Sequence, residues 1–170
     1  MATNMFVKFS NIEGECEDKY HEKWCEITDL EQEFTNPTLP LPPGTREGSG
    51  AKPCKHGEIE IKKFVDKAST GLMEACWKGT IIDKVVIECF RVGLGLGDEK
   101  QPIKYFSIEL EGVIINEFDY EVSEGDLVSE TLNLVAAKAT YAYQQMLKRT
   151  GYAVRGGAAS VTTGTANDDD

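Results

Sequence analysis

Basic residues and long apolar runs are both scarce in this chain of 170 residues. Lysine and arginine together number 18 against 29 acidic residues, so the formal net charge is −11. Because binding to nucleic acid needs concentrated positive charge to neutralise phosphates, this balance excludes nucleic acid as a partner. No stretch approaches the roughly 20 apolar residues of a membrane-spanning helix. The N-terminus also lacks the basic and apolar regions of a signal peptide. We therefore expect no membrane insertion and no export by a signal peptide.

Histidines and closely paired cysteines are scarce as well. The five cysteines include no Cys-x-x-Cys pair, which indicates neither a disulfide framework nor a tetrahedral zinc site and fits a reducing compartment. Only His21 and His56 could activate a cysteine, and Cys16 and Cys54 are their neighbours in sequence. A catalytic Cys–His pair is defined by geometry in space, however, and free cysteines mostly serve in packing. We expect no catalytic, cofactor-binding or metal-binding residue, and hence no enzyme.

The acidic residues gather in two stretches. Residues 13–33 contain nine acids against Lys19 and Lys23, and residues 109–130 contain eight acids with no base. The stretches carry −7 and −8, so the remaining residues are net +4. Such segregation indicates either surfaces for head-to-tail self-association or a solvated acidic face. Choosing a catalytic pair among eight clustered acids would be arbitrary.

Alternation of apolar and polar residues predicts strands over most of the chain. The expected strands are residues 5–9, 20–30, 81–92, 104–110 and 113–122. In the first, Met5, Val7 and Phe9 share one face; in the fourth, Phe106, Ile108 and Leu110 do. In the fifth, the expected half-buried face comprises Ile114, Phe118, Tyr120 and Val122. Residues 127–149 fit a strand or a helix, and propensity alone does not decide between them.

One stretch, residues 64–79, has a helical period. Phe64, Ala68, Leu72, Ala75 and Cys76 fall on one face of a helix expected at about 68–78. Ser69 or Thr70 could cap its start, and Gly79 is a natural stop. A helix this short is unstable alone, so it must pack against a sheet.

Proline and glycine concentrate in a long loop at about residues 35–55, where regular structure cannot persist. Loops of this length are unusual and often functional, and here contact is a better match than catalysis. Its Pro-x-x-Pro spacings also leave open a polyproline ligand. The Gly-x-Gly-x-Gly at 93–97 joins two strands, which favours a hairpin loop over a phosphate-binding loop. Residues 1–150 are expected to form one domain, and residues 151–170 a flexible, acidic-ended tail.

The order of these elements resembles one known family. The residues that carry the resemblance are Gly14-Glu15-x-x-Asp18-x-x-His21-x-x-Trp24, a long Gly-containing loop, Phe64-Val-Asp66-Lys67-Ala-Ser69, Leu72-x-x-Ala75-Cys76-x-x-Gly79, Tyr105-Phe-Ser-Ile-x-Leu-x-x-Val113-Ile and Glu130-x-Leu132-Asn133-Leu134. Together they span about residues 5–143. This pattern is similar to that of the Hcp (haemolysin-coregulated protein) family of type VI secretion systems.

The resemblance implies two antiparallel sheets forming a compact barrel-like domain with one flanking helix, and it makes residues 135–143 a strand. It also implies a homo-hexameric ring, stacked into a tube that a contractile sheath drives out of the cell. The implied partners are further copies of the chain, a VgrG-type spike, the sheath, and effector cargo in the lumen. The protein would assemble in the bacterial cytoplasm and then reach the extracellular space or a target cell.

Within that interpretation, Met73 and Trp77 lie off the core face of the helix and are candidate subunit contacts. Leu39, Leu41, Pro42 and Pro43 in the long loop are candidate ring-stacking contacts. Two other classes stay open from the residues alone. One is a monomeric β-barrel module that binds a small ligand or sugar. The other is a cysteine-dependent hydrolase that uses His21 or His56.

Overall fold

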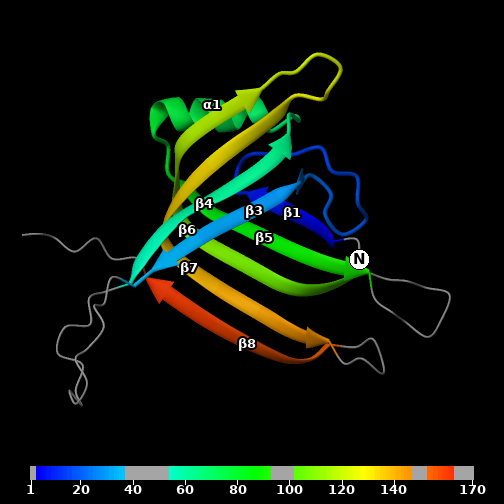
Figure 1. Ribbon diagram of the computed structural model, residues 1–170, viewed down its shortest axis with the longest axis vertical. Coiled ribbons are helices and arrows are strands. Elements are labelled where there is room, and N and C mark those ends of the chain that lie inside the picture. Colours follow the sequence, from blue (N-terminus) through cyan, green and yellow to red (C-terminus); the bar gives the residue numbers. More distant parts are fainter. Residues whose placement is uncertain (1–2, 37–53, 93–101, 147–152, 163–170) are drawn as a thin grey trace, which may run out of the picture.

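The computed structural model describes residues 3–36, 54–92, 102–146 and 153–162 (Figure 1). Within them the order of elements is β1 (Thr3–Phe9), β2 (Cys25–Ile27), β3 (Asp29–Thr35), β4 (Lys55–Phe64), α1 (Ser69–Lys78), β5 (Ile82–Val92), β6 (Pro102–Glu121), β7 (Ser129–Met146) and β8 (Ala153–Thr162). The expected mainly β, barrel-like fold with one flanking helix is confirmed.

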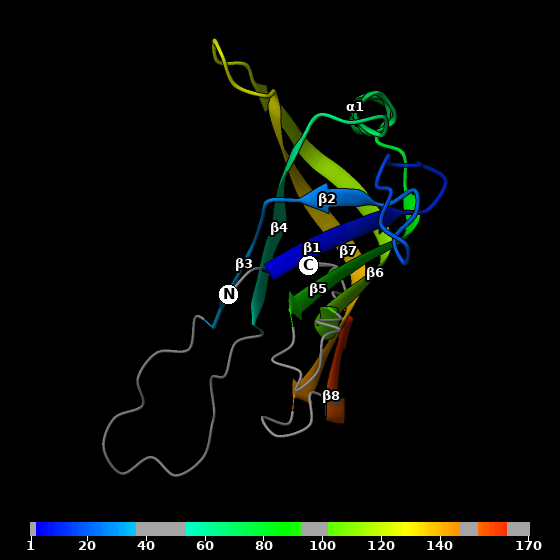
Figure 2. The ribbon, with the colours of Figure 1, turned by 90° about the vertical axis from the view of Figure 1, so that its right-hand side faces the viewer.

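The strands form one curled antiparallel sheet, rather than the two sheets that the resemblance implies. The strand order is β2-β1-β5-β6-β7-β4-β3, and β8 also pairs with β7. β4 pairs with the first part of β7 and β8 with its second part. Since β2 and β3 are consecutive in the chain yet lie at opposite ends of this order, the chain itself crosses between the two ends at Thr28. The amide N–H of Thr28 donates a hydrogen bond to the Lys62 carbonyl of β4 over 2.8 Å. The sheet therefore curls into a half-barrel (Figure 2).

A crease across β5, β6 and β7 gives this single sheet two halves. Successive inward-facing residues of a strand are normally two positions apart. At one place on each of these three neighbouring strands they are three positions apart. The pairs are Ile82 and Val85 on β5, Leu110 and Val113 on β6, and Ala136 and Ala139 on β7. Gly112 lies at that level with φ of 62°, a left-handed conformation that glycine adopts without strain. Each strand thus exchanges its faces at the crease, and the sheet bends there.

The core lies between the two halves, and α1 packs over its upper end. Leu72 and Ala75 of the helix are buried, as expected from their spacing. Phe64 is wrongly predicted as part of that face, because it ends β4 and is about half exposed. Neither Ser69 nor Thr70 is the N-cap residue, which is Ala68. Gly79 ends the helix as expected, in a left-handed conformation with its N–H donating to Cys76 O.

The crease also corrects the predicted faces of β6. Ile108 and Leu110 are buried as predicted, but Ile114 is exposed between the buried Val113 and Ile115. Strict alternation puts Ile114 on the core face, whereas the exchange of faces at Gly112 turns it outward. Tyr120 and Val122, expected on the half-buried face, are exposed because the hairpin joining β6 to β7 extends beyond the core.

Other boundaries differ where local pattern carries little information. The strand expected at 20–30 is replaced by a turn around residues 19–23 followed by β2 and β3. β7 makes residues 135–143 a strand, as the resemblance implies. β8 occupies part of the expected tail, since its backbone pairs with β7 even though its residues are mostly small. The Gly-x-Gly-x-Gly stretch at 93–97 lies outside the described residues. In the described ranges, no helix combines the length and apolar character needed to cross a membrane.

Candidate functional site

His21 is buried at the centre of a cage of aromatic and acidic side chains. Its ring stacks on Phe6 of β1, with centroids 4.1 Å apart, and meets the ring edges of Trp24 and Phe90. Its Nδ1 lies 2.8 Å from an oxygen of Asp18, and its Nε2 lies 3.2 Å from one of Glu88. The cage attaches the acidic loop between β1 and β2 to the sheet.

The cage explains two further observations. Strand alternation puts Phe6 on the face of β1 opposite to the core residue Val7. Phe6 is nevertheless buried, because it covers the His21 ring. The pKa of Asp18 lies below its ordinary value of 3.8, mainly because the His21 ring donates a hydrogen bond to the carboxylate, and also because the Tyr20 amide does. Both ring nitrogens of His21 therefore face carboxylates rather than a thiol.

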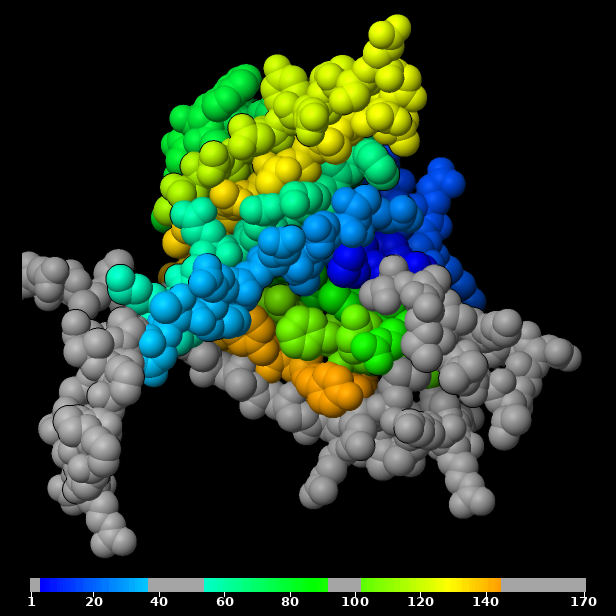
Figure 3. Space-filling model, viewed as in Figure 1, coloured from blue at the N-terminus to red at the C-terminus, as the bar shows by residue number. Residues whose placement is uncertain are grey.

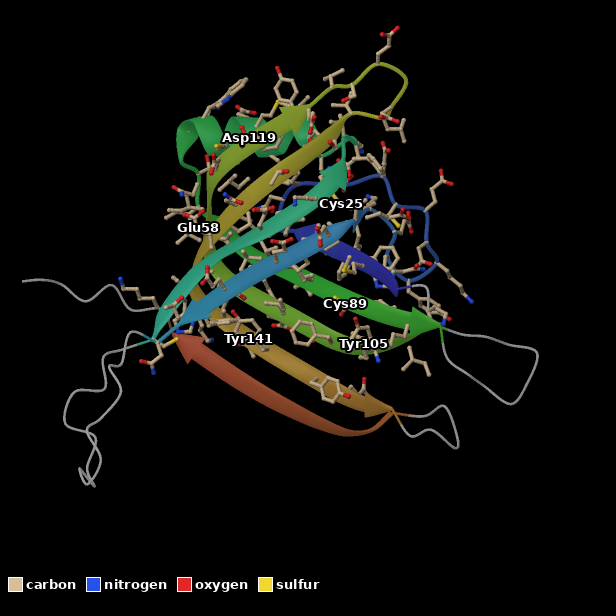
Figure 4. All side chains as sticks on the ribbon, viewed as in Figure 1. Cys25, Glu58, Cys89, Tyr105, Asp119 and Tyr141 are labelled. Atoms are coloured by element: carbon tan, nitrogen blue, oxygen red, sulfur yellow. The ribbon has the colours of Figure 1, made fainter. Side chains whose placement is uncertain are left out.

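Three of the cysteines, Cys16, Cys25 and Cys89, have a thiol pKa above the ordinary value. Burial raises the pKa of the Cys16 thiol, and it also raises that of Cys89 to about 11 and that of Cys25 further. A nucleophilic cysteine needs the opposite shift. Among the described residues, neither histidine forms a hydrogen bond to a cysteine, and His56 instead meets the Phe34 ring edge. Cys25 and Cys89 lie on separate strands inside the barrel (Figure 4).

A buried ionic cluster fixes α1 to the sheet. Lys63 of β4 is fully buried, and its Nζ lies 2.6 Å from Glu130 of β7 and 2.7 Å from Asp66. Asp66 in turn accepts a hydrogen bond from the Ala68 amide at the start of the helix. The Asp66 amide donates to the Ser69 hydroxyl over 2.9 Å. Charges buried without water are tolerated only when paired in this way.

Sequence reasoning missed both buried clusters. A signal for the second was present, because Ile59, Ile61 and Lys63 alternate along β4, which places a lysine on the inward face. The first carried only the local Asp18 and His21 spacing, since Glu88 is 67 residues away from His21.

The outer face of α1 presents a large aromatic side chain to solvent. Trp77 is 81% exposed, and Ile81, three residues beyond the helix, is 62% exposed. Met73 lies one turn before Trp77 and is partly buried. The structure therefore places the two predicted helix residues on one surface, whereas Leu39, Leu41, Pro42 and Pro43 lie outside the described residues.

Two grooves on the surface formed by the described residues have linings that mix charged, polar and apolar groups. One, of about 410 Å³, is lined by the charged loop between β1 and β2, including Glu15 and Asp18, and by Lys67, which lies between β4 and α1. The other, of about 400 Å³, lies at the base of the β6–β7 hairpin between Phe64 and Leu127. In the described residues, no group of three or more His, Cys, Asp or Glu side chains is arranged to hold a metal ion.

One creased antiparallel sheet that curls into a half-barrel, with one covering helix, defines a mainly β, barrel-like protein. A family profile described as "Type VI secretion system effector, Hcp" matches residues 6–144. The chain therefore belongs to the Hcp family of type VI secretion proteins.

Solved structures agree with this assignment at the level of the fold. A structure described as a type six secretion system protein superposes with a TM-score of 0.83 at 20% identity, covering 95% of this chain and 96% of that one. A type VI secretion system effector from Yersinia pestis gives 0.70 at 21% identity, covering 94% and 99%. Hcp1 from Salmonella typhimurium gives 0.69 at 17% identity, covering 95% of each chain. No curated protein sequence matches the chain.

Proposed function

We propose that this protein is a ring-forming subunit of the inner tube of a type VI secretion system. Six copies close into a ring, and rings stack into a tube that the sheath expels together with a VgrG-type spike. The lumen carries effector proteins. Assembly takes place in the bacterial cytoplasm, and the tube is then exported to the extracellular space or into a target cell. Membership of the Hcp family supports this proposal.

The exposed Trp77 is the observation that carries it on this chain. A tryptophan side chain offers about 200 Å² of surface. At about 25 cal/mol per Å², burying the exposed four-fifths of it would stabilise a contact by roughly 4 kcal/mol before the cost of association. The sheet also ends in the edge strand β3, and ring closure is one way to cover such an edge.

The mass of the purified protein tests the proposal. We expect a mass of six chains for the natural protein and a smaller mass for Trp77→Ala, whose fold should persist because the side chain touches little of its own subunit. Lys78→Ala, which removes the neighbouring exposed side chain on the same helix, is the matched control and should keep the ring mass. A natural protein that stays at the mass of one chain at high concentration would refute the ring and favour a monomeric module.

A further inference from the structure

The loop between β1 and β2, residues 10–24, is attached to the outer face of the sheet through His21. The His21 ring is buried, lies parallel to the Phe6 ring and meets the ring edges of Trp24 and Phe90. These rings hold the imidazole in one plane, so its two nitrogens have fixed directions. Figure 3 shows the loop in blue at the right-hand edge of the molecule, beside β1. What the two nitrogens meet therefore decides how firmly the loop is held.

Each nitrogen of the His21 ring meets a carboxylate. Nδ1 lies 2.8 Å from Asp18 of the loop, and Nε2 lies 3.2 Å from Glu88 of β5. A neutral imidazole has one N–H donor and one bare nitrogen, whereas an ionised carboxylate only accepts hydrogen bonds. A neutral ring would therefore leave a bare nitrogen against a carboxylate oxygen, with no hydrogen between them. Only a ring with a hydrogen on both nitrogens satisfies both contacts.

Neighbouring donors keep both carboxylates ionised. The Asp18 carboxylate also accepts a hydrogen bond from the Tyr20 amide over 3.0 Å. The His21 ring and this amide together hold the pKa of Asp18 below its ordinary value. Glu88 is also paired with Lys104 of β6, whose Nζ lies 2.9 Å from its second oxygen. The proton in each contact therefore belongs to the ring rather than to the carboxylate.

The charged groups around the cage form a balanced set when His21 is charged. Glu26 of β2 lies beside Phe6 and 3.6 Å from the Cys16 sulfur. Burial raises the pKa of the Cys16 thiol, so this thiol stays neutral near pH 7. The remaining groups are three carboxylates and two ammonium groups, namely Asp18, Glu26, Glu88, Lys8 over the Trp24 ring, and Lys104. A neutral His21 would leave one carboxylate in excess.

The backbone of the loop is strained and depends on its contacts. In the described ranges, the non-glycine residues with positive φ are Asn11 and Lys23, both at 67° and both in this loop. A lysine rarely adopts this conformation, which persists only where the surrounding structure imposes it. Lys23 lies two residues after His21, and its amide donates to the Cys16 carbonyl. Loss of a His21 contact would thus free a segment whose backbone favours another conformation.

We propose that His21 is a pH-sensitive switch: its doubly protonated ring holds the loop on the sheet, and loss of one ring proton releases the loop and uncovers Phe6 and Phe90. The switch acts within one subunit, so it goes beyond the proposed ring. Between about pH 6 and pH 9 histidine changes its charge, whereas carboxylates and lysines do not. The contact that needs the second proton is present at the lower pH and is lost as the pH rises.

Amide hydrogen exchange between about pH 6 and pH 9 tests the switch. Dividing each rate by that of the unfolded chain at the same pH removes the ordinary pH dependence of exchange. Since a hydrogen bond to a charged group favours the closed loop by about tenfold or more, we expect protection in the loop to fall at least about tenfold as the pH rises. The amide of Val65, which bonds to Val128 away from the cage, should not change. The reporters in the loop are the hydrogen-bonded amides of Gly14, Cys16, His21, Lys23 and Trp24.

Two variants at the Glu88 contact separate the switch from general loosening. In Glu88→Gln, the amide can either accept from Nε2 or donate to it, so the ring fits with one proton or with two. We expect the fall in protection to shrink to about twofold or less, because only the partly exposed pair with Asp18 still favours the charged ring. Lys104→Met removes the ammonium group beside Glu88 and keeps the carboxylate against the ring. It is the matched control and should show the same fall as the natural protein.

Nitrogen NMR of labelled histidine provides a second measurement on the natural protein. We expect both ring nitrogens of His21 to carry hydrogen at about pH 6, and the ring to lose a proton at higher pH than in Glu88→Gln. A neutral His21 ring at about pH 6, loop protection that does not change with pH, or an undiminished fall in Glu88→Gln would each overturn the switch. These results concern the loop of one subunit, so they are independent of the mass that tests the ring.

Discussion

Substituting Gly112 tests whether the crease sets the shape of this protein. The residue lies in the middle of β6 with φ of 62°, where an L-residue with a side chain is strained by roughly 1–2 kcal/mol. An added Cβ would also lie 3.1 Å from the Cβ of Ala137 on β7, which is closer than side chains normally approach. Replacing glycine by alanine makes the unfolded chain less flexible, which offsets about 0.4–1 kcal/mol. We expect Gly112→Ala to lower the free energy of unfolding by about 1 kcal/mol.

Other substitutions at Gly112 should lower the free energy of unfolding according to the backbone strain that each side chain introduces. Gly112→Val should lower it more than Gly112→Ala does, since a β-branched residue is a marked outlier at positive φ. Gly112→Asn should cost less, because asparagine tolerates this conformation. In Gly112→Ala with Ala137→Gly, the close contact is absent and the backbone strain remains, so the double variant measures the two effects separately.

Urea denaturation at one fixed protein concentration is the appropriate assay, because assembly would otherwise shift the apparent stability. Gly125→Ala is the control for backbone strain alone, as Gly125 has φ of 89° with nothing within 4 Å of an added Cβ. If Gly112→Ala were as stable as the natural protein or more so, and Gly112→Val no worse, the crease would not depend on a left-handed residue and the reasoning would fail.

Two further predictions concern the buried clusters. Lys63→Met should lower the free energy of unfolding by about 3–5 kcal/mol, because Glu130 is left as an unpaired buried charge. Lys63→Met combined with Glu130→Leu should recover most of that stability. A double variant as unstable as Lys63→Met alone would contradict the role of the unpaired charge. Because the fold lowers the pKa of Asp18, its contribution to stability is present above the ordinary value of 3.8 and is lost as the pH falls through the lower folded pKa. In pH-dependent denaturation, the difference between the natural protein and Asp18→Asn should therefore shrink below about pH 4, and a difference that grew there would exclude the His21 hydrogen bond as its origin.

Local patterns predicted the parts of the structure that depend on near neighbours in sequence. The spacing of Ala68, Leu72 and Ala75 predicted the buried face of α1, and alternation predicted Ile108 and Leu110 in the core. Gly79 ended the helix as its conformational freedom suggests. The same rules were wrong for Ile114, because alternation counts residues and takes no account of a residue with positive φ.

The exposed surfaces were also predictable from the sequence only in part. The spacing of Met73 and Trp77 off the core face was sufficient to keep both out of the core, although only Trp77 is exposed and Met73 is partly buried. The β6–β7 hairpin was visible in sequence only as part of the acidic stretch 109–130, whereas the exposure of Tyr120 and Val122 followed from how far the hairpin extends beyond the barrel.

The sequence by itself determined the mainly β composition, the single helix and its buried face, the segregation of charge, and the order of elements that resembles the Hcp family. These properties reside in composition, periodicity and local spacing. Only the tertiary structure decided that the strands form one creased sheet, that Lys63 is buried against Glu130, and that His21 is enclosed between Asp18 and Glu88. Each of these depends on residues far apart in the chain, whose contact is set by strand pairing and by the bend at Gly112.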